Sequence, residues 1–197
     1  MQLHAAVEGF MKRRELLKGL LGGGFLGMLS PRILAAPPAD MAGIKMLQAN
    51  WTELLPAGME VPKPTEALKL SDEEWRKRLD RMQYYVLRNE GTESAGTSPL
   101  NDEKRAGVFV CAGCGLPLFT SEMKYDSGTG WPSFFTTIPG TMQTKTDFTL
   151  ILPRTEYHCA RCGGHQGHVF KDGPPPTGQR WCNNGVALKF VPKSGGA

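Results

Sequence analysis

The sequence predicts a mainly β protein of antiparallel sheets, with short helices near the N-terminus and a structural zinc site. The 24 Gly and 15 Pro among 197 residues favour many tight turns. After Gly107 the chain consists of short β-like runs that alternate with turn sequences. In the same region, two Cys-x-x-Cys pairs have the spacing of metal-binding turns.

Composition and charge narrow the function classes. A hydrophobic share of 40% and a charged share of 21% allow a globular core. The net charge is +4, but residues 1–36 hold five basic against two acidic side chains, which leaves 18 against 17 for the remainder. The basic balance therefore belongs mostly to the leader, and we expect no nucleic-acid partner.

Residues 1–36 have the pattern of an export signal. Lys12-Arg13-Arg14 precedes an apolar stretch over 16–29, and Leu34-Ala35-Ala36 supplies small residues for cleavage. The paired arginines resemble a twin-arginine signal, so we expect a periplasmic protein. The stretch is too short and Gly-rich for a good membrane anchor, so no stable insertion is expected after cleavage. A retained amphipathic helix is the alternative.

Residues 37–70 are rich in Pro and Ala and are predicted to form an extended arm before a folded domain over 71–193. That domain starts with a helix, because Ser71 can cap it and Glu74 completes a capping box. Asp80 is expected to cap a second helix that ends near Gly91.

Four apolar runs are predicted to be strands. They cover 108–110, 148–152, 169–170 and 186–191, and turn sequences separate them. A short helical part followed by an antiparallel β domain is the simplest interpretation.

Four of the five cysteines form two Cys-x-x-Cys pairs, Cys111 with Cys114 and Cys159 with Cys162. Two-residue spacing lets both sulfurs of a pair face one point, so the two pairs can supply a closed tetrahedral zinc site. Two local disulfides, or one redox-active pair, are the alternatives. A site made of Cys159, Cys162, His165 and His168 also fits the spacing.

The fifth cysteine, Cys182, lies between Arg180 and Asn184, and on a strand these three would share one face. A guanidinium beside a thiol favours the thiolate, which is the nucleophile, and the amide could hold a polar substrate group. The alternative is an inert buried cysteine with Arg180 in a surface salt bridge.

Two histidines follow the second cysteine pair in a glycine-rich turn. If zinc makes the turn rigid, His165 and His168 are held in place and suit proton donation. Asp172 lies four residues beyond His168 and could orient a ring.

These motifs together resemble the methionine-R-sulfoxide reductases, the B type of peptide-methionine sulfoxide reductase. The similarity runs from about residue 70 to 191, so 71–193 is expected to be the reductase catalytic domain. It implies antiparallel sheets forming a barrel-like or tent-like domain around a cleft, with zinc away from the cleft. The motifs are SGTGWPSF at 127–134, the two Cys-x-x-Cys pairs, HQGHVFKDGP at 165–174, PTGQRWC at 176–182, and Asn184.

The resemblance also implies roles for individual residues. Cys182 matches the nucleophile that takes up the sulfoxide oxygen as a sulfenic acid, and the substrate is free or protein-bound methionine-R-sulfoxide. The histidines His168 and His165 match the proton donors, Arg180 and Asp172 the polar network around the thiol, Asn184 the substrate-contacting amide, and Trp131 the aromatic wall for the S-methyl group.

Three positions depart from the family pattern. Gln166 replaces an aliphatic residue and could alter the substrate rim, while Trp181 replaces the commoner tyrosine. Thr129 stands where many members carry a resolving cysteine. No cysteine remains to resolve the sulfenic acid, so we expect an external thiol reductant, which is thioredoxin-like, glutaredoxin-like or a small thiol.

Two other function classes compete with this interpretation. A zinc-ribbon interaction module would explain the cysteine pairs, but it leaves the segment 180–184 and the two histidines unexplained. A dithiol oxidoreductase would use one Cys-x-x-Cys directly, which tightly bound zinc would exclude.

Overall fold

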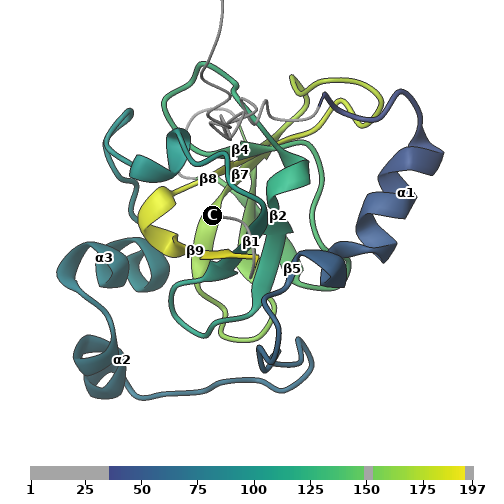
Figure 1. Ribbon diagram of the computed structural model, residues 1–197. Helices are drawn as coiled ribbons and strands as arrows, with labels where there is room; N and C mark the ends of the chain where they lie inside the picture. Colours follow the sequence, from purple (N-terminus) through teal and green to yellow (C-terminus); the bar gives the residue numbers. More distant parts are fainter. Residues whose placement is uncertain (1–35, 149–152, 194–197) are drawn as a thin grey trace, which may run out of the picture. The chain divides into compact units, whose positions relative to one another are not determined.

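The folded chain contains two antiparallel sheets, and a computed structural model describes residues 36–148 and 153–193 (Figure 1). The smaller sheet has the strand order β2-β1-β9 and the larger one the order β3-β4-β8-β7-β6-β5. All strand pairs are antiparallel, which confirms the predicted fold class, and the described strands close no barrel. The strands are β1 (Gly107–Cys111), β2 (Pro117–Thr120), β3 (Lys124–Tyr125), β4 (Ser133–Phe134), β5 (Met142–Asp147), β6 (Arg154–Cys159), β7 (His165–Phe170), β8 (Arg180–Asn183) and β9 (Leu188–Pro192).

Aromatic side chains from both sheets fill the core. Phe119 of β2 stacks on Phe134 of β4 with ring centroids 3.9 Å apart, and Phe109 of β1 meets Phe134 edge-on at 5.1 Å. Tyr157 of β6 packs edge-on against Phe119. All four rings are fully buried, and burial of rings of this size supplies much of the hydrophobic stabilisation of a small domain. This core fixes the position of β8, which carries Cys182.

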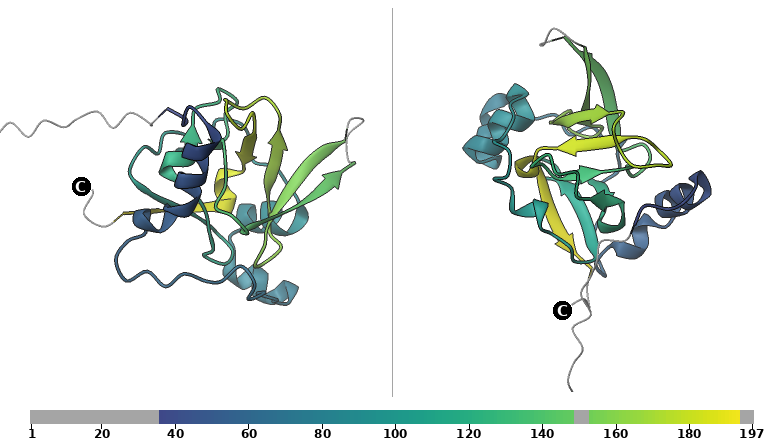
Figure 2. Two further views of the ribbon diagram at one scale, coloured as in Figure 1. Left: turned by 90° about the vertical axis from the view of Figure 1, so that its right-hand side faces the viewer. Right: turned by 90° about the horizontal axis from the view of Figure 1, so that it is seen from above.

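Two short helices precede the sheets, as the sequence predicts. Helix α2 (Asp72–Arg78) has the expected capping box between Ser71 and Glu74. Helix α3 (Arg81–Asn89) is capped by Asp80, and its end agrees with the predicted stop near Gly91. Buried side chains anchor both helices, and α3 packs on β7 (Figure 2).

The prediction of an extended arm over 37–70 is wrong for residues 41–54. Helix α1 (Met41–Ala49) starts at Asp40, whose side chain accepts a hydrogen bond from the Gly43 N–H, and a 3-10 turn, η1 (Trp51–Leu54), follows. Ile44 on this helix is buried, and Gln48 donates to the Thr136 hydroxyl at 2.8 Å. These tertiary contacts stabilise a nine-residue helix whose sequence alone gives little helical signal.

The strand predictions differ in outcome. The runs 108–110 and 169–170 lie in β1 and β7, and 186–191 begins as a 3-10 turn, η4 (Gly185–Ala187), before it becomes β9. A strand over 148–152 is not found at Phe148, which follows β5 and is 75% exposed, and 149–152 lie outside the described residues. The remaining 3-10 turns are η2 (Pro99–Asn101) and η3 (Ser121–Met123).

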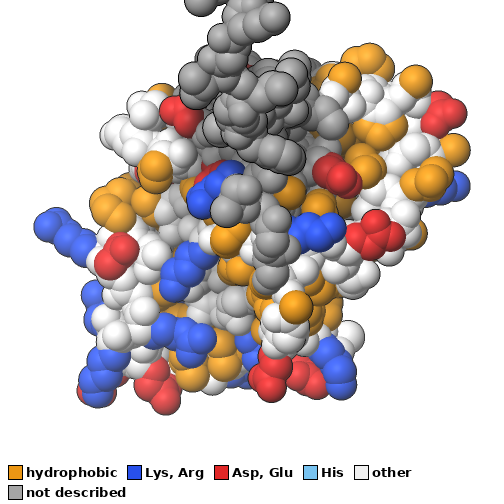
Figure 3. Space-filling view, viewed as in Figure 1, with side chains coloured by type: hydrophobic (Ala, Val, Ile, Leu, Met, Phe, Trp, Pro, Cys, Tyr) orange, Lys and Arg blue, Asp and Glu red, His pale blue; other side chains and the backbone are white. Residues whose placement is uncertain are grey.

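Charged side chains are distributed without a dominant sign. Figure 3 shows Lys and Arg interspersed with Asp and Glu on the face viewed. None of the helices in the described part of the chain has both the length and the apolar character needed to span a bilayer. The predicted signal over 1–36 lies outside the described residues, apart from Ala36.

Candidate active site and metal centre

The four paired cysteines meet in one buried cluster. Cys111 ends β1, Cys159 ends β6, and Cys114 and Cys162 lie in the turns that follow. The four sulfurs lie within 4.8 Å of one another, with Cys111 Sγ 3.7 Å from Cys162 Sγ and Cys114 Sγ 3.5 Å from Cys159 Sγ. All are free thiols, so the structure does not contain the alternative local disulfides.

The cluster geometry fits a tetrahedral zinc ion. Four sulfurs at about 2.3 Å from one ion lie about 3.8 Å from each other, close to the distances found. Thiolate sulfur is also the ligand type of closed structural zinc sites. No histidine belongs to this cluster, so the alternative site with His165 and His168 is not formed.

Both cysteine turns have the same local construction. Gly115 and Gly163 follow the second cysteine of each pair with φ of 76° and 67°, a region that favours glycine. Each glycine N–H donates to the carbonyl of the first cysteine of its pair at 2.8 Å. The Cys-x-x-Cys-Gly sequence therefore builds each half of the cluster locally.

Cys182 lies on β8 in the middle of the larger sheet and is half-buried. Its direct neighbours across the strands are His168 on β7 and Ser133 on β4. It opens into a cavity of about 170 Å³, which aromatic, amide and basic side chains surround. The lining residues are Thr92, Trp131, Arg154, Gly167, His168, Phe170, Cys182, Asn183 and Asn184.

The groups around Cys182 shift the pKa of its thiol in opposite directions. Burial has the largest effect and raises the pKa of the thiol above its usual value. The positive charge of Arg180 and hydrogen bonds from Thr129 and Ser133 lower the pKa, but they do not cancel the effect of burial. Arg180 therefore acts in the direction that the sequence predicts, while the free thiol remains mostly protonated at neutral pH.

Arg180 is held by Asp172 in a two-point contact. The guanidinium donates from Nε and Nη2 to the two carboxylate oxygens at 2.9 and 2.8 Å, and it lies 4.3 Å from the centre of the Phe170 ring. The hydrogen bonds from Arg180 lower the pKa of Asp172. Asp172 thus orients Arg180, and the hypothesis that it orients a histidine ring is wrong.

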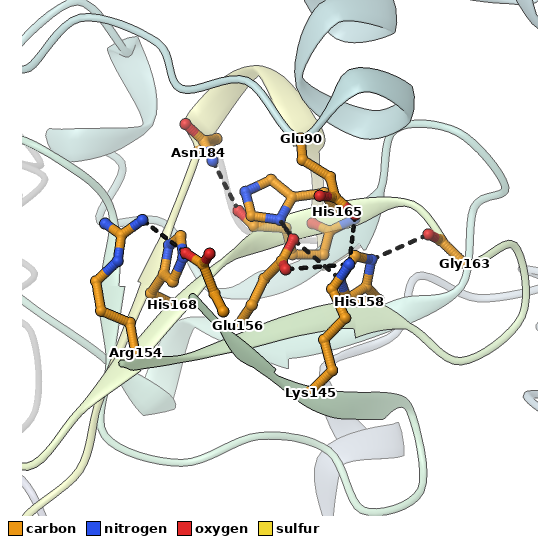
Figure 4. A network of polar contacts seen from close by, with 11 residues as sticks. Glu90, Lys145, Arg154, Glu156, His158, Gly163, His165, His168 and Asn184 are labelled. Atoms are coloured by element: carbon orange, nitrogen blue, oxygen red, sulfur yellow. Dashed lines mark hydrogen bonds and ion pairs between the residues drawn. The ribbon is translucent and has the colours of Figure 1, made fainter. Parts of the chain in front are cut away.

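His168 lines the cleft, and its ring contacts Asp147, which is in turn held by Arg154; the sequence predicted a role for neither residue. Its Nε2 lies 2.9 Å from Asp147 Oδ2, and Arg154 donates to the same oxygen at 2.7 Å (Figure 4). Asp147 and Arg154 face each other across β5 and β6. Only this strand pairing brings the carboxylate to the ring, so no local motif could have indicated it.

His165 is close to His168 but does not line the cleft. Its ring centroid lies 5.5 Å from that of His168, and its Nδ1 contacts Glu156 Oε1. Burial lowers the pKa of His165 to about 4 although Glu156 acts in the opposite direction, so the ring is neutral at pH 7.

Trp131 and Asn184 both line the cleft, and Glu93 connects them. The Trp131 indole donates to the Glu93 carbonyl at 3.1 Å, and Asn184 Oδ1 accepts from the Glu93 N–H at 3.0 Å. The other end of the Asn184 amide donates to the Gln166 carbonyl at 3.1 Å. The amide therefore fixes two backbone segments as well as bordering the cavity.

The three departures from the family pattern lie in different environments. Thr129 lies beside Cys182 and lowers the pKa of its thiol, while Trp181 packs edge-on against Tyr157 at 4.9 Å. Gln166 is fully buried and is not part of the cleft wall, so the expectation that it alters the substrate rim is wrong. Its Nε2 instead donates to Cys111 Sγ at 3.4 Å.

Comparison with known proteins decides the family. The sequence pattern of the SelR domain matches residues 79–192, more than half of the chain. This chain belongs to the SelR family. Similar proteins include peptide methionine sulfoxide reductase B1, chloroplastic, from Oryza sativa, which is 50% identical over 65% of this chain and 60% of its own length. The protein of the same name from Arabidopsis thaliana is 47% identical over 81% of this chain and 79% of its own length. Peptide methionine sulfoxide reductase MsrB from Hahella chejuensis is 50% identical over 67% of this chain and 96% of its own length.

Membership in the SelR family gives the enzyme class. The protein is an oxidoreductase of the peptide methionine sulfoxide reductase type, as the motifs around Trp131, His168 and Cys182 predict. A zinc-ribbon module without chemistry is therefore excluded.

Proposed function

We propose that this SelR protein reduces methionine-R-sulfoxide to methionine, with Cys182 as the nucleophile. The observation that carries the proposal is the placement of Cys182 opposite His168, in a cleft that Trp131 and Phe170 border. A sulfoxide needs a nucleophile for its sulfur, a proton for its oxygen and an apolar surface for its methyl group. The preference for the R epimer follows from the family resemblance.

The reaction transfers one oxygen atom. The Cys182 thiolate attacks the sulfoxide sulfur, His168 delivers a proton to the oxygen, and methionine leaves while Cys182 becomes a sulfenic acid. The cysteine sulfur loses the two electrons that the substrate sulfur gains. The thiol releases one proton and the transferred oxygen takes one up, so the step consumes no net proton.

His165 and Arg180 act in this scheme as positioning residues. The His165 ring packs edge-on against His168 and is held by Glu156, so it helps to fix the orientation of the His168 ring that faces the substrate. Arg180, held by Asp172, lowers the pKa of Cys182 and favours the reactive thiolate.

Recycling requires a thiol from outside the chain. The four other cysteines lie together in the cluster, and Thr129 offers a hydroxyl beside Cys182. An external thiol therefore attacks the sulfenic acid, which forms a mixed disulfide and releases water. A second thiol then frees Cys182. Thioredoxin-like proteins, glutaredoxin-like proteins and small thiols all fit this chemistry.

We propose that the four-cysteine cluster binds one structural Zn²⁺ per chain. The sulfur spacing, the burial and the thiolate donor set all support this choice. When bound, the ion links the turn after β1 to the turn after β6 and supplies stability. Cys182 and the cleft residues carry the chemistry.

We also propose that residues 1–36 form a twin-arginine export signal for a periplasmic enzyme whose catalytic domain spans 71–193. Arg13-Arg14 before the apolar stretch supports the signal, and the SelR match at 79–192 supports the domain. Changing Arg13-Arg14 to Lys-Lys should stop export, as fractionation of cells would show. Unchanged export would contradict the pathway.

The direct test of the reductase function is Cys182→Ser. A hydroxyl is a much poorer nucleophile, so turnover of methionine-R-sulfoxide should fall at least about a thousandfold. Each sulfoxide epimer should be assayed both free and in a peptide, because this also identifies the substrate form. Turnover at the wild-type rate in Cys182→Ser would overturn the proposed nucleophile, and equal rates for the S epimer would overturn the stereochemistry.

A further inference from the structure

Three side chains beside the cleft converge on one point. Glu156 and His158 come from β6 and His165 from β7, and the ligand atoms of the three lie within 4.8 Å of one another (Figure 4). Glu156 and His165 are buried, and the His158 side chain is 13% exposed. We propose that they form a second metal site, separate from the cysteine cluster, for a divalent transition-metal ion such as Zn²⁺ or Co²⁺.

The contact between His158 and Glu156 has the geometry of two ligands of one ion. His158 Nε2 lies 3.0 Å from Glu156 Oε1, yet among the described residues this nitrogen has no hydrogen-bond partner. Two ligand atoms that each lie about 2.0–2.1 Å from one ion are about 3.0–3.4 Å apart, and their lone pairs point at the ion. The separation of these two atoms is therefore the one expected of two ligands that share an ion.

The ring of His158 is oriented as metal-binding histidines are. Its Nδ1 lies 3.1 Å from the Gly163 carbonyl oxygen, which can only accept, so Nδ1 carries the hydrogen. In the neutral ring Nε2 then carries the lone pair, on the side of Glu156. Such a contact from the second ring nitrogen to a carbonyl is the usual support of a histidine ligand.

The groups around the site leave room for a cation. In the metal-free chain His165 Nδ1 makes a hydrogen bond with Glu156 Oε1, and ion binding replaces this bond by two bonds to the ion. The second oxygen, Oε2, lies 3.2 Å from Lys145 Nζ. Lys145 also contacts Glu90 and is half-exposed, so it can turn towards that partner when an ion binds. Two imidazoles and a carboxylate suit zinc and cobalt, and the partly exposed edge at His158 provides access for a water ligand.

Cobalt titration of the tag-free chain, loaded with one equivalent of zinc for the cysteine cluster, tests the proposal. Zinc in the cysteine cluster is measured first by elemental analysis, so a failure of the proposed structural zinc is seen independently. Added Co²⁺ should then bind with one equivalent per chain and give visible d–d absorption. Near-ultraviolet sulfur-to-cobalt absorption should be absent, because no thiol belongs to the second site.

Two variants make the test specific. His158→Gln should weaken cobalt binding at least about tenfold, because it removes a ligand at a partly exposed position. Lys145→Met should strengthen binding, because it removes the competing ammonium. Lys189→Met, at an exposed position of β9, is the matched control and should have no effect. Zinc-loaded wild-type protein without a stoichiometric d–d band would overturn the proposal. So would absorption that His158→Gln leaves unchanged.

Discussion

The two cysteine sites of this SelR protein are built in different ways. The four-cysteine cluster consists of two Cys-x-x-Cys-Gly turns with the same backbone hydrogen bond, and all its sulfurs are buried. Cys182 is half-buried on β8, and its partners come from β4, β7 and the loop that holds Thr129. A site made of local turns uses its sulfur to hold the chain together. A site assembled across strands leaves its sulfur open to a substrate.

The largest expected difference between the sites comes from one substitution made in each. Cys111→Ser should destabilise the fold by more than about 4 kcal/mol and lower the zinc content, because metal binding is folding energy at such sites. Cys182→Ser should leave both nearly unchanged, because the cluster does not include it. Denaturant unfolding and elemental analysis measure the two effects. Equal zinc loss in the two variants would show that the sites are not independent.

Thr129→Cys should give the cleft a resolving thiol. The Thr129 side chain lies close enough to Cys182 to lower the pKa of its thiol, so a thiol there should form a disulfide after one turnover, provided that the sulfurs attain bonding geometry. Wild-type protein should instead accumulate a trappable sulfenic acid without reductant. Mass spectrometry after a single turnover distinguishes these products. A disulfide between Cys182 and a cluster cysteine in wild-type protein would contradict the separation of the two sites.

Arg180→Ala should move the reactivity of Cys182 to higher pH. Burial already raises the pKa of this thiol, and removal of the guanidinium raises it further, so a smaller fraction is thiolate at any given pH. The rate of alkylation by iodoacetamide against pH reports this fraction directly. The Lys189→Ala variant, on the exposed side of β9, is the charge-matched control. A profile that stays in place would show that Arg180 does not act on the thiol.

Gln166→Leu should have the smallest effect, and it acts on the cysteine cluster. It removes the hydrogen bond from Nε2 to Cys111 Sγ, which stabilises a metal-bound thiolate, so zinc should pass to a chelator up to about tenfold faster. Gln143→Leu, at an exposed position of β5, is the matched control. The same release rate in Gln166→Leu and wild-type protein would show that this hydrogen bond does not retain the ion.

Much of the fold was predictable because it depends on neighbouring residues. The capping boxes at Ser71 and Asp80 start α2 and α3 where the sequence indicates. The two cysteine turns that the Cys-x-x-Cys spacing predicts are formed, and Gly115 and Gly163 close them. Helix α1 was missed because Ile44 and Gln48 make the contacts that stabilise it only when the sheets are present.

The sequence by itself determined the cysteine turns, the family and the residues around Cys182, because each depends on a short motif. Only the tertiary structure decided which groups act on those residues. Strand pairing places Asp147 beside His168. Packing of the interior places the buried Gln166 amide within hydrogen-bond distance of Cys111 Sγ. The same burial raises the pKa of Cys182 more than Arg180 lowers it. Motifs fix the identity of reactive groups, whereas strand register and solvent exclusion fix their partners and their charge.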